Sequence, residues 1–144
     1  MRGSSGLEFV DTNVLVYAYN FADPHKHLVA KTLLSGLWNS GKGILSIQVM
    51  QEFYVVVTQK VSNPISSETA IQIIEDLGKW GYHIPKLEDI IEAVQIQQRN
   101  KLSFWDALII CSAKKSGCNI IWTEDLNHNQ VYEGLKVLNP FDSN

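Results

Sequence analysis

The sequence predicts an α/β protein with three layers, in which a short parallel sheet lies between two layers of helices. Short apolar runs alternate with longer amphipathic stretches, the pattern of strands joined by crossover helices. The strand candidates are almost continuously apolar, as expected for strands buried on both faces. With 144 residues, 45% of them hydrophobic and 19% charged, the chain fits one domain over residues 1–144 with an ordinary core.

Helix caps and hydrophobic periodicity define the elements in order. Residues 7–10 form a buried strand that stops at Asp11 and leads into a helix over residues 14–19. Asp23 followed by Pro24 predicts the start of a second helix, which ends near Gly41. The later elements are a strand at 43–46, a helix at 47–60, a helix from Ser66 or Ser67 to about Trp80, a strand at 82–84, a helix at 87–100, a helix from Ser103 to Gly117, and strands at 119–122 and 136–138.

Two of these helices have distinctive apolar patterns. The segment 47–60 is long enough for a helix, although its β-branched run Val55–Val57 favours a strand locally. In the segment 87–100, Leu87, Ile90, Ile91 and Val94 recur at the spacing i, i+3, i+4, i+7. That spacing predicts an amphipathic helix.

Charge and cysteine content limit the classes of protein to consider. The net charge of −3 and a pI near 5.7 oppose binding of duplex DNA by overall charge, but leave room for a local nucleic-acid site. Cys111 and Cys118 are seven positions apart and are not expected to pair, which fits the reducing cytoplasm. No apolar run approaches the ~20 residues that a membrane helix needs. Residues 1–6, MRGSSG, resemble a cloning remnant and are left out of the predicted fold.

Four acidic residues are tied to apolar elements. Asp11 and the Thr123-Glu124-Asp125 turn each follow a predicted strand directly, and parallel strands bring their carboxyl ends to one edge of the sheet. Asp106 lies in the first turn of its helix, and Glu52 lies beside an apolar stretch. Taken singly, Asp106 is explained as a helix charge, Asp125 as a cap and Glu52 as a surface residue. Together, crowded carboxylates are tolerated only if a cation compensates their charge.

The predicted ligands are all oxygen atoms, so the expected ion is Mg²⁺ or Mn²⁺ rather than zinc. Asn13 and Thr123 lie beside the acids and are expected to orient ligands or a water molecule. The chain has 12 basic and 15 acidic residues, so without the four acids of the site its net charge would be 12 − 11 = +1. The rest of the surface therefore need not repel a polyanion such as RNA.

Four segments in order resemble the PIN-domain ribonucleases, specifically the VapC-like toxins of bacterial toxin-antitoxin modules. They are FVDTNVLVYA at 9–18, SIQVMQEFY at 46–54, LSFWDALII at 102–110 and GCNIIWTEDLNHNQ at 117–130, followed by VLNPF at 137–141. The resemblance implies a three-layer α/β/α fold and metal-dependent cleavage of RNA. By position, Asp11, Glu52, Asp106 and Asp125 match the acidic quartet of the family, and Asn13 and Thr123 its supporting polar residues. Asn129 stands where members of the family have glycine in the loop after the last acid.

The resemblance also implies a cognate antitoxin that blocks the acidic pocket, and a homodimer. Independently, the aromatic residues Trp38, Phe53 and Tyr54 and the run Val55–Val57 exceed what a small core absorbs, which can mark a groove for a partner helix.

Two other functions fit parts of the pattern. A phosphoacceptor signalling domain shares the parallel sheet and the acidic metal pocket, but it needs a lysine near its last strand that this sequence does not obviously supply. A PIN domain that has lost catalysis and binds proteins is the other alternative, which the complete quartet disfavours.

Overall fold

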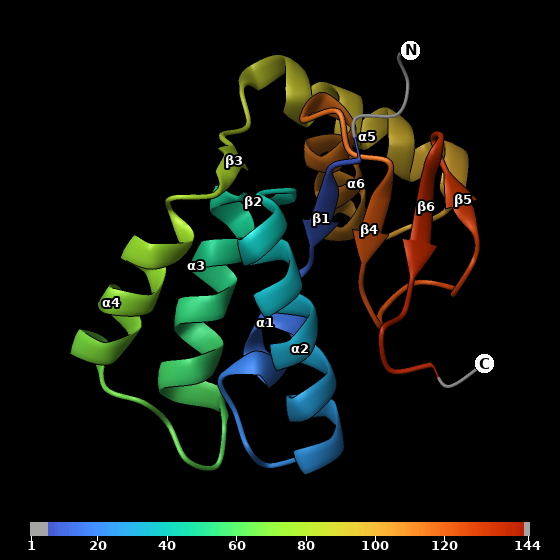
Figure 1. Ribbon diagram of the computed structural model, residues 1–144. Helices are drawn as coiled ribbons and strands as arrows, with labels where there is room; N and C mark the ends of the chain where they lie inside the picture. Colours follow the sequence, from blue (N-terminus) through green and yellow to red (C-terminus); the bar gives the residue numbers. More distant parts are fainter. Residues whose placement is uncertain (1–5, 143–144) are drawn as a thin grey trace.

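A computed structural model describes residues 6–142 of the chain. Its sheet has the strand order β3-β2-β1-β4-β6-β5, and five of the six strands run parallel. The central strand β1 pairs with β2 on one side and β4 on the other (Figure 1). The strand bounds are β1 Glu8–Val10, β2 Gly43–Ser46, β3 Gly81–His83, β4 Ile120–Trp122, β5 Val131–Tyr132 and β6 Leu135–Leu138.

Helices cover both faces of the sheet, as the sequence predicts. The pair α5 and α6 packs together, with α6 against four of the strands, while α2 and α3 pack on β2 from the other side (Figure 1). The helices are α1 Thr12–Ala18, α2 Pro24–Ser40, α3 Ile47–Val55, α4 Ser67–Leu77, α5 Leu87–Asn100 and α6 Phe104–Lys115, with a π-helical segment η1 Val56–Lys60 directly after α3. No helix in residues 6–142 has the length and apolar character needed to cross a membrane.

Several predicted boundaries shift by a few residues. The first helix begins at Thr12 because the Asp11 side chain caps it, accepting a hydrogen bond from the Thr12 amide. The helix predicted to reach Trp80 ends at Leu77, and the next strand begins one residue early, at Gly81. Residues 1–5 of the suspected cloning remnant lie outside the described residues, whereas the Gly6 amide donates to Asn119 Oδ1 at 2.9 Å.

The predicted parallel sheet gains one short strand at its edge, where β5 pairs antiparallel with β6. The two strands are joined by Glu133 and Gly134, which have φ values of 55° and 82°. A two-residue turn with positive φ at both positions closes a tight hairpin, which glycine makes possible at the second position. A strand of two residues, Val131–Tyr132, was too short to identify from its hydrophobic pattern.

The segment 47–60 is helical but not uniform. It begins as an α-helix capped by Ser46 Oγ, which accepts from the Val49 amide at 3.2 Å, and changes to a π-helix at Val56. The Thr58 hydroxyl donates to the Tyr54 carbonyl oxygen at 2.7 Å, in competition with the backbone bond that an α-helix would make there. The β-branched run predicted to disturb this helix therefore lies where its geometry changes.

Helix α5 presents its apolar stripe to solvent rather than to the core. Leu87 and Ile91 are 73% and 53% exposed, and Ile90 and Val94 are exposed as well, whereas Asp89 on the opposite face is only 4% exposed. The amphipathic pattern at 87–100 is correct as a helix prediction, but the face turned toward the core carries Ala93 and Ile96 together with the buried Asp89. Apolar periodicity therefore located the helix without fixing its orientation.

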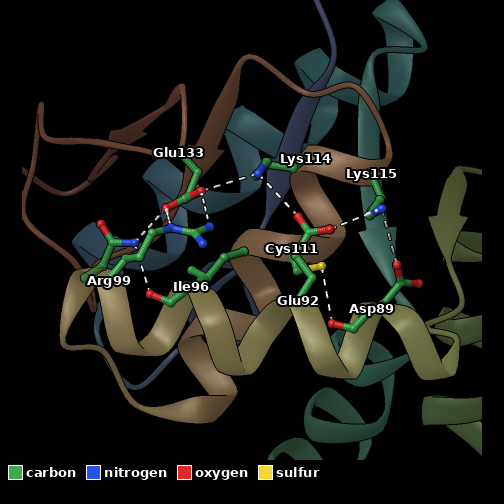
Figure 2. A network of polar contacts seen from close by, with 9 residues as sticks. Asp89, Glu92, Ile96, Arg99, Cys111, Lys114, Lys115 and Glu133 are labelled. Carbon is green, nitrogen blue, oxygen red and sulfur yellow. Dashed lines mark hydrogen bonds and ion pairs between the residues drawn. The ribbon is translucent and has the colours of Figure 1, made fainter.

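The inner face of α5 is held by charged groups (Figure 2). The Arg99 guanidinium binds the Glu133 carboxylate at 2.8 and 3.2 Å, and Lys114 links Glu133 to Glu92 at 3.4 and 3.3 Å. The Arg99 contact lowers the pKa of Glu133 to about 2. These bonds connect α5, α6 and the turn of the β5–β6 hairpin, so charge pairs add to the apolar packing of Ala93 and Ile96 at this edge.

Candidate metal-dependent active site

The Asp11 carboxylate lies at the junction between β1 and α1, at the carboxyl edge of the sheet. Its Oδ1 caps α1, and its Oδ2 accepts a hydrogen bond of 2.8 Å from the Thr123 hydroxyl. Asp11 also continues the pairing of β1 with β4, because its amide donates to the Trp122 carbonyl oxygen at 3.0 Å. Asp11 and Thr123, 112 residues apart in sequence, are therefore neighbours, as the rule for parallel strand ends predicts.

Asn13 connects the two sides of the site. Its amide nitrogen donates to Asp125 Oδ2 at 3.0 Å and lies 3.2 Å from the Thr123 hydroxyl oxygen, and its Oδ1 accepts from the Glu124 amide at 3.2 Å. Asn13 thereby fixes the turn after β4 against the start of α1. Asp125 reaches the site through this contact, so the sequence reasoning correctly placed Asp11, Asn13, Thr123 and Asp125 together.

Glu52 joins the site from α3 through two residues that sequence reasoning missed. Thr12 Oγ1 donates to Glu52 Oε1 at 2.8 Å, and Gln48 Nε2 donates to Glu52 Oε2 at 3.2 Å. Gln48 is buried, and its Oε1 has no hydrogen-bond partner among the described residues. The i, i+4 spacing of Gln48 and Glu52 on one helix was the available sequence signal.

Asp106 occupies the first turn of α6, where Ser103 Oγ caps the helix by accepting from the Asp106 amide at 3.1 Å. Within the described residues, Asp106 has no side-chain hydrogen bond to the other three acids. It is nevertheless close enough to sense them, because the charges of Asp125 and Glu52 contribute to raising its pKa, after partial burial as the main cause.

The crowding of negative charge is most evident at Asp11. The pKa of Asp11 is raised to about 7, mainly by burial. Hydrogen bonds from Thr123 and Thr12 oppose this rise, and the negative charges of Asp125 and Glu52 add to it. The four predicted acids therefore share one electrostatic environment. A cation in that environment would relieve both the desolvation and the mutual repulsion.

The site fits a hard divalent ion in its donor chemistry, but the side chains do not form a closed cage. Its donors are carboxylate, hydroxyl and amide oxygens, the ligands that Mg²⁺ and Mn²⁺ prefer. Among residues 6–142, however, no three acidic, histidine or cysteine side chains lie close enough together to enclose a metal ion as they stand. Bound water molecules would have to complete any coordination shell, as is common for Mg²⁺.

The loop after β4 is held beside the site by its own contacts. Lys26 Nζ lies 2.8 Å from Glu124 Oε1 and sits against the rings of Tyr17 and Phe141. Further along the loop, Asn129 has a φ of 68°, in the left-handed region. Asparagine adopts this conformation more readily than most residues, so Asn129 is compatible with a position where glycine is expected.

Together, the fold and the site define an α/β protein with a cluster of acidic and other oxygen-bearing side chains at the carboxyl edge of its sheet. The family model described as "PIN domain" matches residues 9–134. The chain belongs to the PIN domain family, which confirms the resemblance drawn from its motifs. No curated protein matches the chain significantly.

Solved structures share the fold at low sequence identity. VapC20 of Mycobacterium tuberculosis, described as a sarcin-ricin loop cleaving toxin, is 21% identical, with a TM-score of 0.65 over 82% of this chain and 91% of that one. A toxin-antitoxin complex from Klebsiella pneumoniae matches with 17% identity and a TM-score of 0.71 over 94% and 98%. DNA-bound VapBC from Salmonella typhimurium matches with 16% identity and a TM-score of 0.61 over 91% and 96%.

The raised pKa of Asp11 predicts the pH dependence of stability in the absence of metal. A carboxyl group whose pKa rises from about 3.9 unfolded to about 7 folded stabilises the fold while protonated, and this contribution is lost as the pH rises from 4 through 7. Urea unfolding in EDTA should therefore show that Asp11→Asn gains stability relative to the parent protein between pH 5 and pH 8. Glu75→Gln, at an exposed position, is the control. A constant difference between Asp11→Asn and the parent across this range would contradict the prediction.

Proposed function

We propose that this protein is a metal-dependent endoribonuclease and the toxin of a toxin-antitoxin pair. The observation that carries the proposal is the grouping of Asp11, Asp125 and Glu52 around Asn13, Thr123 and Thr12 at the carboxyl edge of the sheet. It is supported by the PIN domain match and by a structural neighbour described as a toxin that cleaves the sarcin-ricin loop. An RNA substrate and two free cysteines, Cys111 and Cys118, favour the cytoplasm as its location.

In this proposal the four acids, Asp11, Glu52, Asp106 and Asp125, hold Mg²⁺ or Mn²⁺. A bound ion of this type would supply a Lewis acid and a water molecule of lowered pKa for phosphodiester hydrolysis. Asn13 and Thr123 fix the carboxylates of Asp125 and Asp11. An acid among the four that is not bound directly to the ion is suited to take a proton from water.

The family match reduces the support for a phosphoacceptor domain. It covers residues 9–134, including all four acids, and Asp11 caps a helix rather than standing free at a strand end. The remaining alternative is a PIN domain without catalysis, which an activity measurement on the folded chain decides.

We expect Asp11→Asn to lower the cleavage rate of a single-stranded oligoribonucleotide at least about 100-fold, because the substitution removes a charge that the metal requires. EDTA should abolish cleavage by the parent protein, and added Mn²⁺ should restore it. The assay follows a fluorogenic oligoribonucleotide, with Glu75→Gln as the matched control and circular dichroism to establish folding. Full activity of a folded Asp11→Asn variant would refute the assignment, and a folded parent protein that neither cleaves RNA nor binds Mn²⁺ by calorimetry would indicate the non-catalytic alternative.

We propose that an antitoxin docks in a cleft formed by α1, α2 and α4. The cleft has a volume of about 360 Å³, and Trp38, which is 45% exposed, and Trp80 form its aromatic wall. Tyr19 and Leu34 also line it, and Lys31 and Asn39 supply polar groups. The structural neighbour from Klebsiella pneumoniae is described as a toxin-antitoxin complex, which supports an antitoxin as the occupant. Phe53 and Val57, in contrast, are core residues and do not contribute to a groove.

A test of this cleft uses the protein encoded beside this one. Trp38→Ala should weaken its binding at least about tenfold in calorimetry, because a tryptophan in a pocket is a common hot spot. Leu28→Ala, at an exposed position of the same helix, should leave binding unchanged. Equal affinities for the two variants would exclude this cleft as the docking site.

We propose a homodimer through the face formed by β3 and α5. Six large apolar side chains are exposed there, and they are Tyr82, Ile84, Leu87, Ile90, Ile91 and Val94. Exposed apolar patches of ~300–600 Å² commonly serve binding. β3 is also an edge strand of the sheet, so a twofold axis beside it would let the same apolar residues of two copies meet.

Ile91→Glu is expected to convert the dimer to a monomer at micromolar concentration, because it would bury two uncompensated charges at the twofold interface. Multi-angle light scattering after gel filtration measures the mass, and Leu28→Glu serves as the control for adding a charge elsewhere. A monodisperse monomer for the parent protein, or a dimer for Ile91→Glu, would disprove this interface.

A further inference from the structure

A hollow lies on the outer surface of α3 and η1, immediately beside Glu52. Its volume is about 240 Å³, and its lining residues are Gln51, Glu52, Val55, Val56 and Lys60. Glu52 also contacts Thr12 in the acidic site at 2.8 Å. The hollow therefore adjoins the acidic site, with Glu52 forming part of both.

The π-helical segment explains how Lys60 reaches this hollow. Glu52 and Lys60 are eight residues apart in sequence. In a regular α-helix, their side chains would therefore point about 80° apart around the helix axis. The i→i+5 bonds of η1 widen the turn, so each residue advances less around the axis and Lys60 returns toward the face of Glu52. Thr58 supports the wider turn through its bond to the Tyr54 carbonyl oxygen.

Lys60 carries an uncompensated charge. Within the described part of the chain, the ammonium groups of Lys26, Lys114 and Lys115 pair with carboxylates, whereas Lys60 makes no ion pair or hydrogen bond through its side chain. The Glu52 carboxylate next to it is already engaged by the Thr12 hydroxyl and the Gln48 amide. Lys60 is exposed, so its ammonium group remains available to an anion from solvent.

We infer that Lys60 binds a phosphate group of the RNA strand, one next to the phosphate that is cut. The inference rests on the proposed ribonuclease activity and adds to it a subsite for the RNA backbone along α3 and η1. An RNA strand that enters the acidic site is repelled by four carboxylates. The positive charge of Lys60, in the hollow that Glu52 also lines, offsets part of this repulsion. Since Lys60 contacts a phosphate rather than a base, it contributes affinity without sequence preference.

The experiment compares Lys60→Met, Lys60→Arg and Lys136→Met. Lys136 is exposed, forms no side-chain ion pair in the described residues and lies at the opposite end of the parallel strands, so its substitution changes the net charge equally. Each substitution is placed in the Asp11→Asn background, and binding of a fluorescein-labelled single-stranded oligoribonucleotide is followed by fluorescence anisotropy at several salt concentrations. The same substitutions in the parent chain give KM and kcat.

For Lys60→Met we expect roughly a three- to tenfold rise in Kd and in KM near 0.1 M salt, with kcat within about twofold. The slope of the logarithm of the association constant against the logarithm of the salt concentration should become shallower by about 0.7. This is the value for one phosphate contact on a single-stranded nucleic acid. Lys60→Arg should restore binding, and Lys136→Met should match the background.

The possible failures can be distinguished. If Lys60→Met behaves like Lys136→Met while the parent protein cleaves RNA, the backbone subsite is wrong and the ribonuclease proposal stands. If kcat falls with KM unchanged, Lys60 acts on Glu52 rather than on a phosphate, which also overturns the inference. If the parent protein neither binds nor cleaves RNA, the proposed function fails and the subsite fails with it.

Discussion

The buried carboxylate of Asp11 is the constraint on which the site depends. It caps α1 and accepts a hydrogen bond from the Thr123 hydroxyl, so its position joins β1, α1 and the loop after β4. The negative charges of Asp125 and Glu52 act on it as well. A carboxylate in this position is costly to desolvate. Three hydrogen-bonding neighbours, Thr12, Asn13 and Thr123, reduce the cost, but the raised pKa shows that they do not remove it. The surplus of negative charge is the feature on which the proposed binding of a cation rests.

Most of the fold and the core of the site could be predicted from sequence because each follows from a local rule. Parallel strands place their carboxyl ends together, which brought Asp11 to Thr123, and serine caps located the starts of α4 and α6 correctly. The residues that hold Glu52 were missed because Thr12 and Gln48 are ordinary residue types whose role appears only when α3 packs beside α1. Hydrogen bonds between distant elements leave little trace in periodicity.

The orientation of α5 shows a second limit of sequence patterns. Its apolar stripe was expected from spacing, yet the structure turns Asp89 inward and leaves Leu87 and Ile91 exposed. The charges of Asp89 and Glu92 are compensated by lysines of α6, and Lys114 also pairs with Glu133 of the hairpin turn (Figure 2). These partners are far from α5 in sequence. Hydrophobic periodicity identifies the apolar side of a helix. Whether that side packs on the core or faces outward depends on the rest of the fold.

The position of β1 in the middle of the sheet has a consequence for synthesis on the ribosome. Although β1 is the first strand of the chain, its neighbour β4 spans Ile120–Trp122, and Thr123 and Asp125 follow that strand. A nascent chain that has not yet reached this part cannot assemble the acidic site, whatever the rest has folded into. Any activity that requires these acids together is therefore delayed until translation has passed Asp125, when most of the domain has already been made.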